Sequence, residues 1–147
     1  MKKLITLFAM SIFTLNIQSA ELLPLTDFMK TADPNDPVSF EMIAKRCSAI
    51  NLAMTNYSRE GDQVYELAIQ NYVAWFHLAT EARALKYPED NFVDSEINIR
   101  DSVLNIAKMV NKEFTNNQDL TGSLFKDTFL EDDINICGDM ITAIYAE

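Results

Sequence analysis

The chain has 147 residues, a formal net charge of −10 and a hydrophobic fraction of 48%. This length suits one domain with its own core, and the apolar fraction excludes wholesale disorder. Three glycines argue against an all-β fold with many tight turns, and the excess of 22 acidic over 12 basic residues argues against nucleic-acid binding.

Residues 1–20 have the layout of a signal peptide. Two lysines precede an apolar run over residues 4–15, and cleavage is expected after Ser19 or Ala20. The alternative is an uncleaved membrane anchor, but the run is shorter than the roughly 20 residues that span a bilayer. Without residues 1–20 the chain has 10 basic and 22 acidic residues and a net charge of −12. We therefore expect a soluble protein exported to the periplasm or the extracellular space, with no stable membrane association.

Residues 21–38 are expected to form an extended arm. Three prolines, Pro24, Pro34 and Pro37, lie within it, and proline disfavours helix both at its own position and at the one before. The arm also carries apolar residues between Leu22 and Met29. These residues either pack on the body of the protein or dock on a partner, and the sequence does not choose between the two.

Residues 39–147 are expected to form four helices. Asp36 and Pro37 form a start signal for the first, and Gly61 is expected to end it. Its apolar positions follow steps of three and four residues, which is the pattern of a bundle seam: Phe40, Ile43, Cys47, Ile50, Met54 and Tyr57.

The second helix, over 62–86, is apolar around most of its circumference, so we expect it to be the most buried. The third is expected over 89–115, ending where residues 116–119 and Gly122 break the pattern. The fourth is expected over 123–146. Short connections between four long helices predict an all-α, antiparallel up-and-down four-helix bundle.

The two cysteines are expected to form one inter-helix disulfide. Cys47 and Cys137 each lie about ten residues from the same end of the bundle if the first and fourth helices are antiparallel neighbours. The alternative is a pair of buried free thiols. Gly138 is expected to allow a close approach of two helices.

Motifs for catalysis and for metal or cofactor binding are missing from the sequence, so we expect no enzyme, no metal and no cofactor. The single histidine, His77, lies four residues before Glu81, which places both on one helix face. It is either a base or haem ligand, or a histidine held by Glu81 at the bundle boundary. The acidic run Glu131, Asp132 and Asp133 is interpreted as a solvated helix face rather than a calcium site.

The second helix holds a candidate interaction or ligand surface, because it has more aromatic residues than one core-facing stripe needs. These residues are Tyr65, Tyr72, Trp75, Phe76 and His77. The alternative is that they all pack against neighbouring helices. The favoured hypothesis is an exported helical protein that acts on another protein, one with a basic surface, as an adaptor, inhibitor or immunity-type protein. The second hypothesis is a bundle that holds an apolar small molecule or haem near Trp75 and His77.

Overall fold

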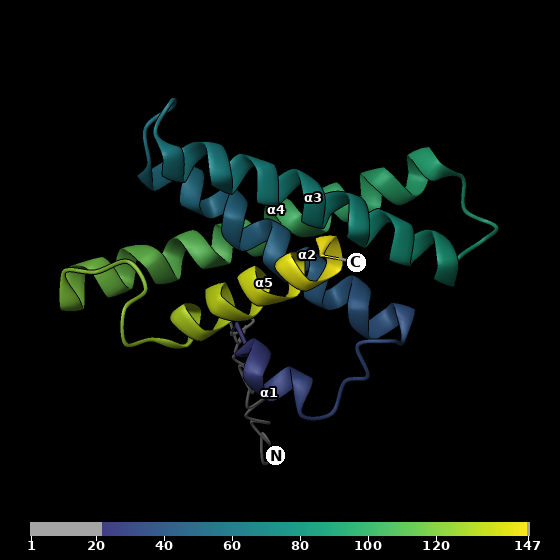
Figure 1. Cartoon of the computed structure of the whole chain (residues 1–147), viewed down its shortest axis with the longest axis horizontal. Helices are drawn as coiled ribbons and strands as arrows, with labels where there is room; N and C mark the ends of the chain where they lie inside the picture. Colours follow the sequence, from purple (N-terminus) through teal and green to yellow (C-terminus); the bar gives the residue numbers. More distant parts are fainter. Residues whose placement is uncertain (1–21, 147) are drawn as a thin grey trace, which may run out of the picture.

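A computed structural model describes residues 22–146 of the chain. The predicted signal peptide lies outside the described residues. Within them the protein is all-helical, with a short α1 (Leu25–Met29) followed by four long helices: α2 (Pro37–Met54), α3 (Gln63–Lys86), α4 (Phe92–Thr121) and α5 (Phe129–Tyr145). Successive long helices run in alternating directions (Figure 1), as the prediction of an up-and-down bundle requires.

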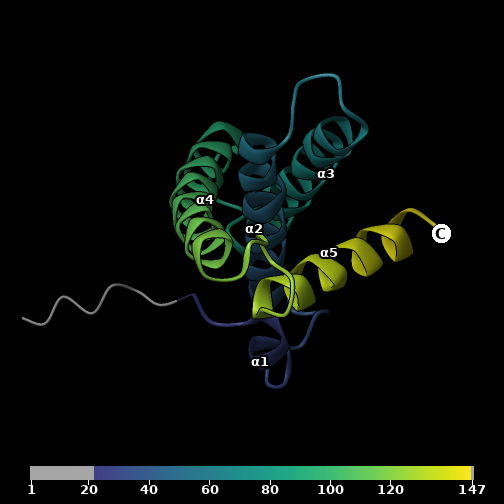
Figure 2. The ribbon, with the colours of Figure 1, turned by 90° about the vertical axis from the view of Figure 1, so that its left-hand side faces the viewer.

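The central helix is α2, and the expectation that residues 62–86 form the most buried helix is wrong. Ten of the 18 residues of α2 are buried, against five of the 24 in α3. Figure 2 shows α3 and α4 on either side of α2, with α5 diverging from α3 on a third side. Small residues such as Ala44, Ser48 and Ala53 allow neighbouring helices to approach α2 closely. The apolar residues of α3 are too many for its one buried face, so several of them remain exposed.

Three predicted helix boundaries are wrong. The first helix ends at Met54 and is followed by a single 3-10 turn, so Gly61, with a φ of +87°, lies in the loop instead. The helix α4 continues through residues 116–119 and ends at Thr121, followed by Gly122, whose φ of +76° is typical of a C-terminal cap. Because α4 includes these polar residues, the next helix starts at Phe129, six residues later than expected.

The predicted arm packs on the body and is not extended throughout. Residues 25–29 form α1 after Pro24, and Leu25 is buried against the core. The start signal of α2 is confirmed, since the Asp36 carboxylate accepts a hydrogen bond of 3.0 Å from the Ser39 N–H. That bond holds the pKa of Asp36 below its ordinary value.

Candidate functional site

The predicted disulfide joins α2 to α5. Cys47 and Cys137 are both buried, and their Cα atoms are 5.4 Å apart. The bond closes a loop of 90 residues and pins α5 against the central helix. A buried disulfide is typical of proteins that fold in an oxidising compartment.

A buried ion pair lies beside the disulfide. Asp133 is fully buried and accepts two hydrogen bonds from Arg46, at 3.0 Å from Nε and 2.6 Å from Nη2. The other carboxylate oxygen accepts the Leu25 N–H at 2.7 Å. One carboxylate therefore joins α1, α2 and α5, and the interpretation of Asp133 as part of a solvated helix face is wrong.

The electrostatics of this pair follow from its burial. Burial raises the pKa of Asp133 and lowers the pKa of Arg46, and the charge of each partner offsets part of the other's shift. The sequence carries a weak signal for the pair once the disulfide is assumed. Arg46 adjoins Cys47, and Asp133 lies one helical turn before Cys137, so both fall beside the same crossing point.

The five residues of the predicted aromatic surface do not share one environment. The Trp75 ring is 0% exposed and packs against Phe40, with ring centroids 6.4 Å apart. The side chains of Tyr65, Tyr72 and Phe76 are half-buried, and His77 is exposed. Within the described residues no hydrogen bond or ion pair joins His77 to Glu81. Trp75 therefore belongs to the core, and His77 lies apart from it on the outer face of α3.

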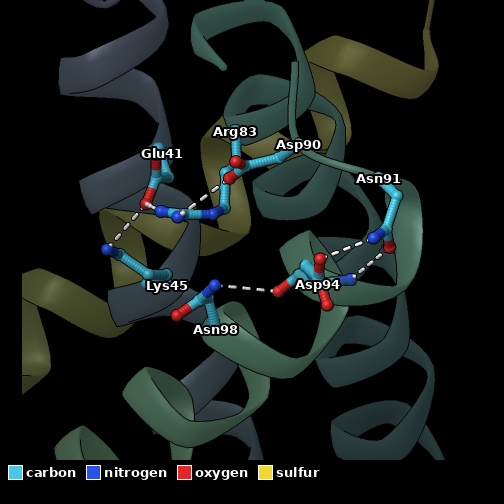
Figure 3. Close-up of polar contacts among 7 residues, drawn as sticks. All are labelled: Glu41, Lys45, Arg83, Asp90, Asn91, Asp94 and Asn98. Atoms are coloured by element: carbon cyan, nitrogen blue, oxygen red, sulfur yellow. Dashed lines mark hydrogen bonds and ion pairs between the residues drawn. The ribbon is translucent and has the colours of Figure 1, made fainter. Parts of the chain in front are cut away.

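A second charged cluster lies where α2 meets the α3–α4 connection (Figure 3). The buried Glu41 contacts Lys45 at 2.9 Å and Arg83 at 3.8 Å, and Arg83 also reaches Asp90 at 3.3 Å. The Arg83 guanidinium lies over the Tyr87 ring, 4.7 Å from its centroid. Every charge in the cluster contacts an opposite charge, and none of these side chains lines a cavity described below. The cluster fixes the α3–α4 loop against α2.

A groove lies between α3 and α5, with α2 as its floor. It encloses about 490 Å³. Two of its apolar side chains, Val64 and Leu67, lie one turn apart on α3 and are each 55% exposed. The residues lining it come mainly from these three helices and include Ile50, Met54, Val64, Leu67, Ile134 and Gly138.

The lining of the groove has one acidic residue and no basic one. No lysine or arginine occurs in α3 before Arg83, and α5 contains no basic residue. Of the four acidic residues of α5, Asp133 is buried and paired with Arg46. Asp139 lines the groove itself. The nearest basic residues in sequence, Arg59 and Lys126, belong to the flanking loops. Low-dielectric walls of one charge sign favour a ligand or partner of the opposite sign.

A cavity of about 420 Å³ lies where the arm crosses α2 and α4. Seven of its lining residues are apolar: Leu22, Leu23, Leu25, Phe28, Met42, Ile106 and Met109. Arg46 also lines it, but its guanidinium is already bonded to Asp133 and to the Leu23 carbonyl oxygen. The cavity therefore offers apolar surface and few free polar groups.

Among residues 22–146 no group of three or more histidine, cysteine or acidic side chains is arranged to hold a metal ion. The helices of the same range include none with the length and hydropathy of a bilayer span. Fold and site together define a disulfide-bonded, all-α protein with an apolar-lined groove that carries Asp139 and no basic residue. No protein-family model matches the chain, and no match was found among curated proteins or solved structures.

Proposed function

We propose that the protein is an exported helical protein that acts by binding another protein, as an adaptor, inhibitor or immunity-type protein rather than as an enzyme. Export is supported by the signal-peptide layout of residues 1–20 and by the buried disulfide. The periplasm and the extracellular space both suit a protein of this kind.

The observation that carries the proposal is the exposed apolar face of α3 in the groove. Val64 and Leu67 face open space between α3 and α5, although the core of the same molecule buries smaller residues of α3 such as Ala68 and Ala79. Apolar side chains gathered in a polar-rimmed groove mark a protein contact more often than scattered exposed ones do. Asp139 in the groove, the absence of lysine and arginine from its lining and the net charge of −10 suit a basic partner.

The test compares two substitutions of exposed leucines. Leu67 lines the groove, and Leu120, 83% exposed near the end of α4, does not. Tagged wild type, Leu67→Glu and Leu120→Glu proteins are isolated from the native cells, and copurifying proteins are quantified by mass spectrometry. We expect one partner to be recovered equally with wild type and Leu120→Glu and at least about tenfold less with Leu67→Glu. Equal recovery with all three proteins, or no partner with any, contradicts the proposal.

A second candidate function is the binding of an apolar small molecule. The arm cavity favours it, because its walls are apolar and its volume of about 420 Å³ lies in the range of small-molecule sites. The region of Trp75 and His77 gives this function no support, since Trp75 is fully buried in the core and His77 is exposed on the outer face of α3. Native mass spectrometry of the isolated protein tests the candidate: a bound mass lost in Met42→Trp, which fills the cavity, supports it, and an unliganded mass contradicts it.

A further inference from the structure

Gly138 lies in the interior of α5 without a structural need for glycine. Glycine is among the weakest helix formers at an interior position. The backbone of Gly138 does not have a positive φ, and a Cβ built on it would meet no atom within 4 Å. The expectation that Gly138 allows two helices of this molecule to approach closely is therefore wrong. The folded chain leaves open space where the side chain would be.

That open space belongs to the groove. Gly138 is exposed and lines the α5 wall, next to Cys137, where α5 is fastened to α2. The missing side chain leaves the backbone of α5 accessible from the groove. A position without a Cβ allows another backbone to approach more closely than any other residue type does. Since no contact within the molecule requires a glycine at position 138, the close approach of a partner's backbone would explain why this position is a glycine.

We propose that the groove receives a helix of a partner protein, packed against α5 at Gly138, with an apolar stripe flanked by lysine or arginine residues. This inference rests on the proposed function and names the element that the partner contributes. The apolar stripe would contact Val64, Leu67 and Ile134, in the recognition mode in which an amphipathic helix fills a groove. The partner helix would lie over the floor of the groove, which α2 forms with Ile50, Asn51 and Met54.

Charge favours a different protein over a second copy of this chain as the occupant. The walls of the groove carry Asp139 and lack basic residues, and α5 has no lysine or arginine along its length. A second copy that inserted its own α5 would place acidic residues against acidic residues. A helix flanked by basic residues would instead find Asp139 on the α5 wall and no lysine or arginine among the lining residues.

The experiment places a photoreactive side chain in the groove. Asn71, which lines it, is replaced by p-benzoylphenylalanine in the protein made in its native cells, and the crosslinked partner segment is sequenced by mass spectrometry. The same assay is repeated with Gly138→Ala, Gly138→Leu and, as the matched control on an exposed position of α5 outside the groove, Ala143→Leu. Thermal unfolding of each variant verifies that it is folded.

We expect the crosslinked segment to carry apolar residues at helical spacing and flanking lysines or arginines. Gly138→Leu should reduce crosslinking at least about tenfold, and Ala143→Leu should leave it unchanged. Gly138→Ala should raise the midpoint of thermal unfolding by about 4 °C and still reduce crosslinking, which separates loss of binding from loss of folding.

Two outcomes overturn the inference and leave the proposed function standing. In the first, both Gly138 variants still form the crosslink. In the second, the crosslinked segment lacks apolar residues at helical spacing or lacks flanking lysines and arginines. The first would show that nothing packs closely on Gly138, and the second that the partner contributes another element. If the photoreactive residue at position 71 crosslinks to a second copy of this chain, the choice of a different protein as occupant is overturned. If the protein with p-benzoylphenylalanine at position 71 and no further substitution forms no crosslink, both the inference and the proposed function fail.

Discussion

Removing the Asp133 carboxylate should strongly lower the free energy of unfolding, because this one side chain contacts three segments of the chain. Asp133→Ala leaves the buried Arg46 guanidinium with the Leu23 carbonyl, at 3.4 Å, as its remaining hydrogen-bond acceptor and with the Phe129 ring centroid 5.8 Å away. It also leaves the Leu25 N–H without its acceptor. Three segments of the chain lose their shared contact at once, since the arm, α2 and α5 meet at this carboxylate.

The magnitude follows from what remains buried. Breaking one partner out of a buried ion pair costs about 3–5 kcal/mol, because an uncompensated charge stays behind. Removing both charges with Arg46→Met and Asp133→Leu avoids that cost and leaves chiefly the unpaired Leu25 N–H, worth about 1–3 kcal/mol. The raised pKa of Asp133 and the lowered pKa of Arg46 agree with this order, because both shifts reflect the cost of burying the charges.

The assay is urea unfolding at neutral pH with the disulfide intact, followed by far-ultraviolet circular dichroism. We expect Asp133→Ala to be the least stable protein and the double variant to lie between it and wild type. The reasoning is refuted if Asp133→Ala loses less than about 1 kcal/mol, or if the double variant is no more stable than Asp133→Ala.

Two further predictions concern the disulfide and the start of α2. Replacing Cys47 and Cys137 together with alanine should lower the free energy of unfolding by up to about 4–5 kcal/mol, since the bond closes a loop of 90 residues; an unchanged urea midpoint would contradict this. Asp36 has a lowered pKa through the Ser39 N–H, so its contribution to stability is present above the unfolded pKa and is lost as the pH falls through the folded pKa. Asp36→Asn keeps an acceptor for the Ser39 N–H but does not titrate, so its free energy of unfolding should fall less than that of wild type when the pH drops below about 4. The same pH dependence of the free energy of unfolding in both proteins would contradict this prediction.

The sequence predicted the helices from local patterns, and the disulfide followed from the expected arrangement of those helices. Apolar spacing located the four long helices, and Cys47 and Cys137 could be paired because their distances from one end of the bundle agree. The cap at Asp36 was predictable from two adjacent residues for the same reason. The end of α4 was not, since a polar run such as 116–119 is compatible with an exposed helix as well as with a loop.

The groove depends on how whole helices are arranged, which apolar spacing alone does not specify. An apolar α3 predicts burial, but α2 has the smaller side chains and becomes the central helix, which leaves Val64 and Leu67 exposed. The role of Asp133 could not be assigned either, because an acid early in a helix is typical of a solvated face. Only the crossing of α2 and α5 brings it to Arg46, 87 residues away in the sequence.

Hydrogen–deuterium exchange of the disulfide-bonded protein, with and without the partner that it captures, tests the central claim most directly. If the groove between α3 and α5 is the binding site, the partner should slow amide exchange in residues 63–71 and 134–139 and leave residues 116–121 of α4 unchanged. Slowed exchange in the arm or along α4, with none in the two walls of the groove, would contradict the account.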